Sequence, residues 1–584
     1  MRKSVFLLVL LASFGTRSLI SQNALTGAGD ASASDLDSLK ARIAEQQAQI
    51  KKLQQAVEAQ EKLLERALEP ATAAKASPME TTPAAAPATT ADGTAVETAS
   101  TTNVAPPVKL TPAIEFGRNP LVTPVQQTPQ SSSHNPCDEG NPSPTFIHLG
   151  NVCIVPVGFM DLTAVWRDKN AGSSIGTNFG SIPYNNTTNA KNSEFRFSPQ
   201  NSRIGFRIDG DWKGTHFIAY NEFDFLGTSG ATNIGVTNGA FVQRLRLFWV
   251  DARKGKVEFL AGQSWSMLTP NRSGISALPG DLFYSQVMDV NYMAGLTWTR
   301  QPGMRVLVHP SDKVTMGVSF ENPDQYMGGS SGGGAAVLPA ALTGLAATQL
   351  DNGGTIGTAN TVLTTPTVMP DIIAKIALDP SSRFHFEVAG IVSEFKIFNP
   401  NTGKALGAGE HFSTTGAGLQ FGLNVAVVKN FRLITTNFWD DGEGRYLFGQ
   451  APDVIVRDNG ALSAVHSLGT VDGFEATVKN TLLFAYYGGI YIGRDVTFDT
   501  TGKPVGYGYL GSANSQNRAI QEGTFGFNQT VWKNPRYGAI NLIGQYEYAT
   551  RDPWAVAVSA PRATHDNTIY FDVRYSLPGS MPKF

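Results

Sequence analysis

Residues 202–226 read SRIGFRIDGDWKGTHFIAYNEFDFL, and this stretch decides the fold. Between 203 and 209, apolar side chains alternate with Arg203, Arg207 and Asp209. Because successive side chains of a β-strand point to opposite faces, such a strand has one apolar and one charged face. Lys213-Gly214 separates this run from a second alternating run, and two residues suffice for a tight turn. The stretch therefore predicts an antiparallel hairpin with two chemically different faces.

The same alternation recurs to the end of the chain and predicts sixteen strands. Most have about ten residues, the length that a tilted strand needs to cross a bilayer. The predicted fold class is all-β, a 16-stranded antiparallel transmembrane β-barrel, although other strand limits would give 14 or 18 strands. The predicted strands are 158–167, 202–212, 215–226, 241–252, 256–266, 298–308, 313–321, 371–379, 384–395, 413–427, 430–439, 472–478, 481–493, 520–532, 537–549 and 567–577.

Short and long connections alternate between the predicted strands. Seven are tight, including 253–255, 428–429 and 479–480, and they alternate with eight long loops such as 267–297 and 440–471. Tight turns at one rim and long loops at the other are typical of outer-membrane barrels. A soluble β-sandwich, the alternative fold for such strands, does not sort its loops in this way. An even strand count also places both ends of the barrel at the short-turn rim, on the periplasmic side.

The chain before the barrel has the composition of an exported protein. Met1-Arg2-Lys3 and a short apolar run from Val5 to Ala12 predict a secretory signal, cleaved near Ala24 or Ala33. An Ala-, Pro- and Thr-rich stretch further on has too little apolar surface to fold. The predicted domains are a signal peptide (1–33), a coiled coil (34–69), a disordered linker (70–145) and the barrel (146–584).

The predicted α-helical coiled coil rests on a heptad repeat. Its a and d positions are apolar or glutamine, which keeps one stripe of the helix facing a partner. The linker that follows offers no second helix, so we expect the partners to be copies of the same chain, in a homotrimer. A single solvated helix is the alternative. The a and d positions are Leu36, Leu39, Ile43, Gln46, Ile50, Leu53, Val57, Gln60, Leu64 and Ala67.

Two cysteines, Cys137 and Cys153, lie 16 positions apart before the first predicted strand. In an exported protein such a pair is predicted to form a disulfide, with two buried thiols as the alternative. A zinc site would need more ligands than this pair supplies.

Charged residues on the inward faces of the predicted strands are the candidate pore-lining residues. Guanidinium groups along a narrow aqueous path favour carboxylate or phosphate solutes. The alternative is a neutralised ladder of ion pairs that only ties strands together. Leu245 and Leu247 are predicted to face lipid, and the loops 267–297 and 322–370 are candidates for a constriction. The predicted pore-lining residues are Arg203, Arg207, Asp209, Glu222, Asp224, Arg244, Arg246, Arg305, Arg432, Asp572 and Arg574.

No catalytic signature stands out in the sequence. It contains no His-Glu-x-x-His helix, no Cys-x-x-Cys pair and no phosphate-binding loop. His385, Glu387 and Glu394 would be the polar residues of a site, but ordinary lumen or rim positions explain them better. We therefore expect no enzyme, no catalytic residue, no metal and no cofactor. The formal net charge of −2 gives no indication of a nucleic-acid partner.

Six short motifs follow the heptads and the linker in a distinctive order. They are NSRIGFR (201–207), EFDF (222–225), RLR (244–246), GQSWS (262–266), RQP (300–302) and FDVRY (571–575). With this arrangement the chain resembles the DcaP-like family of trimeric outer-membrane porins. The resemblance implies a 16-stranded trimeric pore for small, often anionic, organic solutes. The long linker, the cysteine pair, the loop 328–367 and the extension to Phe584 depart from the family pattern.

The leading hypothesis is an outer-membrane pore for passive diffusion, with its coiled coil in the periplasm. Its expected partners are outer-membrane lipid, copies of itself and small anionic solutes. One alternative is an outer-membrane barrel enzyme such as a lipid hydrolase, since catalytic residues that meet only in space leave no sequence signature. Another is a structural tether between the outer membrane and the cell wall.

Overall fold

The computed structural model describes residues 136–137, 142–227, 241–283, 286–330, 332–353, 365–400 and 409–580. All of them belong to one compact unit of the chain. The predicted signal peptide and coiled coil, and the linker as far as residue 135, lie outside the described residues.

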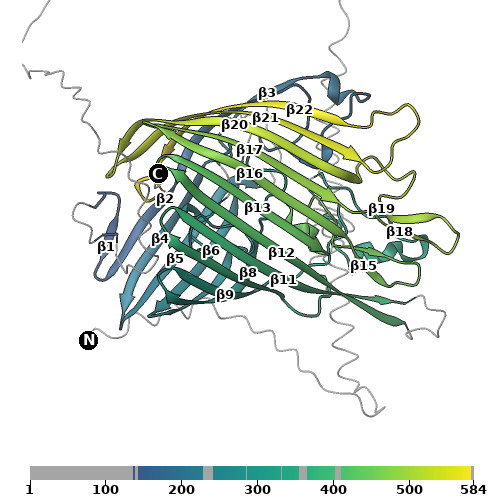
Figure 1. The fold of residues 1–584 in the computed structure, drawn as a ribbon, viewed down its shortest axis with the longest axis horizontal. Helices are drawn as coiled ribbons and strands as arrows, with labels where there is room; N and C mark the ends of the chain where they lie inside the picture. The colour runs from purple at the N-terminus through teal and green to yellow at the C-terminus, as the bar shows by residue number, and fades with distance from the viewer. Residues whose placement is uncertain are drawn as a thin grey trace, which may run out of the picture. The chain divides into compact units, whose positions relative to one another are not determined.

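Sixteen long strands form one closed antiparallel barrel (Figure 1). Each strand pairs with the next along the chain, and β2 pairs with β22 from Phe159–Ser576 to Arg167–Thr568, which closes the barrel. The prediction of an all-β, 16-stranded antiparallel barrel is confirmed. The strands are β2 (Val152–Arg167), β4 (Arg203–Trp212), β5 (Thr215–Gly227), β6 (Val242–Lys254), β7 (Val257–Trp265), β8 (Arg300–Ser311), β9 (Val314–Glu321), β10 (Asp371–Ser381), β11 (Phe384–Asn399), β12 (Glu410–Val428), β13 (Phe431–Asp441), β16 (His466–Val478), β17 (Thr481–Ile492), β20 (Asn517–Asn534), β21 (Gly538–Pro553) and β22 (Thr564–Ser576).

The described residues also contain short strands and 3-10 helices between the barrel strands. No helix in the described part of the chain is long and apolar enough to span a bilayer. The short strands are β1 (Ile147–Leu149), β3 (Glu194–Ser198), β14 (Val454–Val456), β15 (Leu462–Ala464), β18 (Asp495–Phe498) and β19 (Pro504–Tyr507). The 3-10 helices are η1 (Phe179–Ser181), η2 (Asn189–Lys191), η3 (Pro279–Asp281), η4 (Ala340–Ala347), η5 (Gly444–Tyr446) and η6 (Pro578–Ser580).

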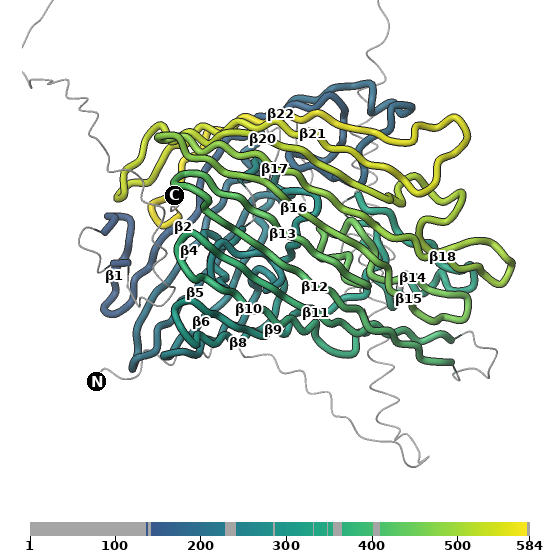
Figure 2. Tube along the Cα trace, viewed as in Figure 1, coloured from purple at the N-terminus to yellow at the C-terminus, as the bar shows by residue number. Residues whose placement is uncertain are grey.

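The tight turns and the long loops lie at opposite ends of the barrel (Figure 1). In the turn between β4 and β5, Lys213 and Gly214 both have positive φ, 49° and 74°. Two successive residues of this kind match the right-handed twist of the flanking strands and close a two-residue hairpin. The β14–β15 and β18–β19 hairpins belong to the long loops at the other end, where Figure 2 traces them.

The outside of the barrel wall is largely apolar and the inside largely polar. On β22, Ile569, Phe571 and Val573 are 48%, 46% and 44% exposed, whereas Asp572 among them is 0% exposed. β-Branched and aromatic residues at alternating positions favour the extended chain and cover its outer face. A soluble barrel would show the reverse arrangement, with its charged side chains outside.

One prediction about the wall is wrong at β6. Leu245 is 43% exposed on the outside, but Leu247 is 0% exposed. The register with β5 shifts here: Glu222 pairs with Leu247 and Phe223 pairs with Leu245, so that Arg246 is an extra residue. A β-bulge of this kind re-aims the side chains that follow it. Leu247 therefore lies inside the barrel, although alternation alone placed it outside.

Loop residues pack against the inner wall. Leu268 and Ile275 belong to the long loop between β7 and β8, are both 0% exposed, and pack with Ile373 of β10 and Ile391 of β11. Burial of such side chains stabilises the loop by roughly 1.5–3 kcal/mol each. The barrel interior is thus partly filled by a loop of the same chain. This loop therefore affects which inward charged side chains are exposed to water.

Candidate functional site

The loop between β7 and β8, residues 266–299, crosses the interior of the barrel, and we call it the crossing loop. Its Tyr292 hydroxyl accepts a hydrogen bond from Arg246 of β6 (3.1 Å), and its Ala294 amide donates one to Glu522 of β20 (2.9 Å). Its Asn271 amide donates to Glu387 of β11 (3.2 Å). These are the fourth, fourteenth and ninth strands of the barrel, so the loop contacts the wall on all sides.

Six charged residues from four strands meet beside the crossing loop, and we call them the arginine cluster. Arg246 is bound to Glu222 (2.7 Å) and to Asp224 (2.8 Å). Arg244 is bound to Asp224 (2.7 Å). The cluster holds four guanidinium groups and two carboxylates, an excess of two positive charges. Its members are Arg203 of β4, Glu222 and Asp224 of β5, Arg244 and Arg246 of β6, and Arg300 of β8.

The pairing of β4, β5 and β6 and the bulge in β6 bring the side chains of this cluster together. Asp224 pairs with Arg203 on one side and with Arg244 on the other, so the three side chains lie in one row. Arg246 is the bulged residue, and its guanidinium reaches the acids of β5. Side chains that face each other across an antiparallel ladder lie about 5 Å apart, which suits ion pairs.

Arg300 is the member that sequence reasoning did not select. Its guanidinium lies 5.4 Å from the ring centre of Trp265 and 5.6 Å from that of Trp298. Such contacts stabilise a cation without neutralising it. Among the described residues Arg300 forms no ion pair, so it contributes its full charge to the cluster. Its motif, Arg300-Gln301-Pro302, was the only sequence signal for this position.

The positive charges of the arginine cluster act on Tyr292 of the crossing loop. Burial alone would raise the pKa of the Tyr292 phenol, but the charges of Arg246 and Arg203 outweigh burial and lower the pKa. The field that stabilises a phenolate also stabilises other anions placed near this hydroxyl. The arginine cluster therefore acts as an electropositive region at the edge of the crossing loop.

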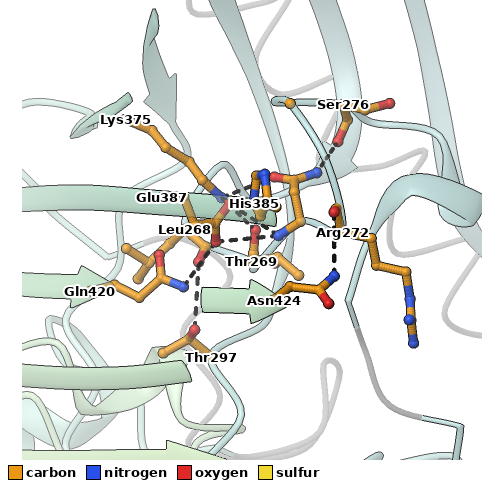
Figure 3. Close-up of polar contacts among 12 residues, drawn as sticks. Leu268, Thr269, Arg272, Ser276, Thr297, Lys375, His385, Glu387, Gln420 and Asn424 are labelled. Atoms are coloured by element: carbon orange, nitrogen blue, oxygen red, sulfur yellow. Dashed lines mark hydrogen bonds and ion pairs between the residues drawn. The ribbon is translucent and has the colours of Figure 1, made fainter. Parts of the chain in front are cut away.

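A second group of charges, which we call the lysine cluster, fixes the start of the crossing loop (Figure 3). Lys375 of β10 lies 2.8 Å from Glu387 of β11, and both side chains are 0% exposed. Lys375 also donates to the backbone oxygen of Thr269 (3.0 Å) and to Asn271 (2.9 Å) in the loop. His385 lies 3.3 Å from Glu387. Its other ring nitrogen contacts Asp379 of β10 (2.9 Å), which completes the cluster.

The three residues that the sequence offered for a possible site do not stay together in the structure. His385 and Glu387 belong to the lysine cluster, but Glu394, also on β11, has its hydrogen bond with Thr415 at the long-loop end. Its strand neighbours Ser393 and Phe395 are buried, so Glu394 faces outward. The alternation along β10 would also have placed Lys375 inside the barrel, but no sequence pattern indicates its contact with the crossing loop.

The other predicted pore-lining residues also point into the barrel and have contacts of their own, although Arg574 and the cluster member Arg203 lie over the same Phe159 ring, at 4.0 and 5.1 Å from its centre. Arg207 lies 2.6 Å from Asp209. Arg574 lies 3.0 Å from Asp161 and 3.3 Å from Asp572.

The last two predicted arginines have fewer charged contacts. Arg432 donates to the side-chain oxygen of Asn424 (2.6 Å). Arg305 is 3% exposed, and its Nε and Nη2 atoms have no hydrogen-bond partner among the described residues. The sequence therefore predicted the inward direction of these side chains but not their grouping.

Sequence reasoning also missed Arg272, a crossing-loop residue. Its guanidinium binds Glu475 of β16 at 2.7 and 3.0 Å, and Tyr486 of β17 donates to the same carboxylate (2.7 Å).

No described group of His, Cys, Asp and Glu side chains has an arrangement that would hold a metal ion.

Two further features lie away from both clusters. A disulfide joins Cys137 to Cys153 of β2, whose side chain is fully buried. At the long-loop end, the described part of the loop 322–370 covers β11: the Phe398 amide donates to Gln349 (2.7 Å). The same loop pairs with the β18–β19 hairpin through Val337 and Gly506. This loop therefore covers the rim, whereas the crossing loop lies across the interior.

No protein-family model and no curated protein sequence matches the chain. Among solved structures, the outer membrane channel DcaP of Acinetobacter baumannii is similar, with 16% identity and a TM-score of 0.52 over 74% of this chain and 99% of that one. An anion-selective porin from Comamonas acidovorans aligns at 12% identity over 73% of this chain and 100% of that one. Its TM-score of 0.39 is too low to support a conclusion about this chain. The resemblance predicted from the sequence motifs is thus confirmed at the level of the fold: the chain folds like the DcaP channel.

Proposed function

We propose that this chain is an outer-membrane porin, a passive diffusion pore for small solutes with a preference for organic anions. A closed barrel leaves no unpaired strand edge, and an apolar outer face suits the hydrocarbon of a bilayer. The predicted signal peptide would export the chain, and both ends of the barrel at the short-turn rim would leave the coiled coil in the periplasm. In this proposal the protein has no catalytic role.

The arginine cluster carries the proposed anion preference. Its excess of two positive charges lies beside the loop that crosses the interior, where a passing solute is closest to protein. The side chain of Arg244 is 40% exposed, so part of this charge reaches water. Cations that line a narrow path raise the local concentration of anions and lower that of cations.

Copies of the chain are proposed to assemble through the predicted heptads. The a and d stripe between Leu36 and Ala67 has no partner within the sequence, and β-branched residues at a suit a small parallel oligomer. The proposed assembly is a homotrimer. Mass measurement of the purified protein in detergent tests it, and a monomer at micromolar concentration would contradict the proposal.

Conductance in a planar bilayer tests the pore directly. We expect discrete single-channel steps, and a reversal potential under a KCl gradient whose sign indicates that chloride permeates better than potassium. The sign should persist with gluconate in place of chloride, because the arginine cluster recognises charge. A folded protein that inserts without conducting would refute the pore, while a conducting protein with cation preference would refute only the selectivity.

A further inference from the structure

In the lysine cluster, the amine of Lys375 contacts both a carboxamide and a carboxylate (Figure 3). Its Nζ atom lies 2.9 Å from the side-chain oxygen of Asn271, a residue of the crossing loop. The same Nζ atom lies 2.8 Å from Oε2 of Glu387. An amine, a carboxamide and an acid that moves protons between them are the groups that form an isopeptide bond between a lysine and an asparagine.

These three side chains are shielded from water. Those of Lys375 and Glu387 are 0% exposed, and Asn271 is 4% exposed. Ile373 and Ala377, which share the inner face of β10 with Lys375, are also fully buried. A dry site disfavours the charges of an ammonium and of a carboxylate, so transfer of the proton from Lys375 to Glu387 costs less here than in water. The transfer produces the uncharged amine that a nucleophile requires.

The carboxamide of Asn271 is held in one orientation. Its Nδ2 atom donates a hydrogen bond to the backbone oxygen of Ser276 (3.2 Å), and only the nitrogen of a carboxamide can donate. The oxygen therefore faces Lys375, and the nitrogen that would leave points elsewhere. The backbone amide of Asn271 donates to both carboxylate oxygens of Glu387, at 3.2 Å each, so the residue is anchored to the same acid that contacts the amine.

Neighbouring groups also hold the amine and the acid in place. The backbone oxygen of Thr269 accepts a hydrogen bond from Lys375 (3.0 Å). His385 lies 3.3 Å from Oε2 of Glu387, and Gln420 donates to Oε1 of the same residue (3.4 Å). Reacting groups that are fixed at such distances react far faster than the same groups free in solution. Thr269, His385 and Gln420 are thus positioning residues.

A second buried lysine shows that burial alone does not produce this arrangement. Lys169 is 4% exposed, and its Nζ atom donates to the hydroxyl of Thr564 (2.7 Å) and to the backbone oxygen of Pro183 (3.3 Å). Among the described residues, neither a carboxamide nor a carboxylate is hydrogen-bonded to Lys169. The reactive set of groups therefore belongs to Lys375.

We propose that Lys375 and Asn271 become joined by an isopeptide bond. Lys375 transfers one proton to Glu387, and the free amine attacks Asn271, so that a bond forms between Nζ and Cγ. A further proton moves from Nζ to Nδ2 by way of Glu387, the Cγ–Nδ2 bond breaks, and ammonia leaves. Glu387 ends the reaction as the uncharged acid. No oxidant, reductant or further reactant is needed, and the reaction takes place once in each chain.

The bond would make the anchor of the crossing loop covalent. It joins two positions that are 104 residues apart in the sequence, one in the loop and one in the barrel wall. A loop fixed in this way stays inside the barrel even when the hydrogen bonds around it break. The inference does not depend on the proposed membrane location or on the proposed pore.

Peptide mass spectrometry of the purified full-length protein tests the bond. After denaturation, reduction and digestion with trypsin, we expect one branched peptide that joins the segment with Asn271 to the segment with Lys375. Its mass should be lower than that of the two segments together by about 17 Da, the mass of ammonia. Two unlinked segments, with Asn271 either intact or deamidated, would overturn the inference.

Two variants show which side chains form the bond. Lys375→Arg keeps a positive charge but has no amine, so we expect only unlinked segments. Asn424→Ala is the matched control, because Asn424 carries a neighbouring carboxamide whose hydrogen bonds are to Arg272 and Arg432. The branched peptide should persist in this control. A branched peptide that contains residue 271 in Lys375→Arg would overturn the inference, since another lysine would then be the nucleophile.

The variant Glu387→Gln tests the role of the acid. The time course of the branched peptide is followed while the unfolded protein refolds into detergent, and only the folded fraction is counted. Without an acid to move protons, we expect the bond to form roughly 100-fold more slowly than in the native protein. An equal rate would overturn the assignment of Glu387. If this variant does not fold, the peptide masses of the native protein still decide whether the bond exists.

Discussion

The two ends of the crossing loop rest on two charged clusters that differ in balance and in access to water. The lysine cluster pairs Lys375 with Glu387, and both side chains are 0% exposed. The arginine cluster holds four guanidinium groups and two carboxylates, and the side chain of Arg244 is 40% exposed. A paired, dry group holds structure, whereas an unbalanced group in contact with water attracts ions. From this difference we expect the selectivity of the proposed pore to depend on one end of the loop and the anchoring of the loop on the other.

The largest effect is expected from breaking the lysine cluster. Glu387→Gln keeps the shape of the side chain but leaves Lys375 buried without its counter-charge, which costs about 3–5 kcal/mol. The double variant Lys375→Met/Glu387→Gln should recover most of this loss, because it leaves no buried lysine without its counter-charge. Equilibrium unfolding in detergent with urea measures both. A single variant as stable as the native protein would show that the lysine cluster does not anchor the loop.

The disulfide variant separates stability from selectivity. Replacing Cys137 and Cys153 by serine opens a link across 16 positions. In the chain-entropy model this lowers the free energy of unfolding by roughly 3 kcal/mol. The bond contacts neither cluster, so the reversal potential of the folded variant should equal that of the native pore. A changed reversal potential would mean that global stability, and not the arginine cluster, controls ion preference.

A smaller, pH-dependent effect is expected at the rim loop, away from both clusters. Burial, together with the charge of Asp324, raises the pKa of Asp351 to about 6, against about 3.9 in an unfolded chain. The folded loop therefore binds this proton more tightly. The resulting stabilisation is complete below about pH 4 and is lost as the pH rises through about 6.

Hydrogen-exchange protection of residues 325–351, corrected for intrinsic rates, should fall between pH 4 and pH 7 in the native protein. Asp351→Asn removes the titration and should flatten this profile. The protection of the crossing loop should be the same in both proteins. A native profile that is already flat would contradict the assignment to Asp351.

The sequence predicted the wall far better than it predicted the interior. Alternation and tight turns marked all sixteen barrel strands, because each strand has a fixed period and one apolar face. The bulge at Arg246 broke that period without a glycine or proline to mark it, and the position of Leu247 was wrong for this reason. Strands β1 and β3 and the loop hairpins are too short to show a period.

The candidate site depends on contacts between distant segments. Arg203 and Arg244 follow from strand alternation, but Tyr292 enters their cluster through the path of a loop nearly fifty residues from Arg244. Lys375 is inward by alternation, yet its bond to the backbone of Thr269 has no local signature. The sequence therefore predicted that these charged side chains face inward, and only the structure shows that positive charge gathers at one place.

The reversal potential of Arg244→Ser under a salt gradient tests the central claim most directly. Arg244 is partly exposed, so its loss should change the free energy of unfolding by only about 0–1 kcal/mol. Arg518→Ser is the matched control, because Arg518 is 50% exposed on the outside near the long-loop rim. At about 0.05 M salt we predict that Arg244→Ser moves the reversal potential toward cations, that about 1 M salt largely removes the shift by screening, and that the control leaves it unchanged. An identical reversal potential in Arg244→Ser and the native pore at low salt would contradict the account.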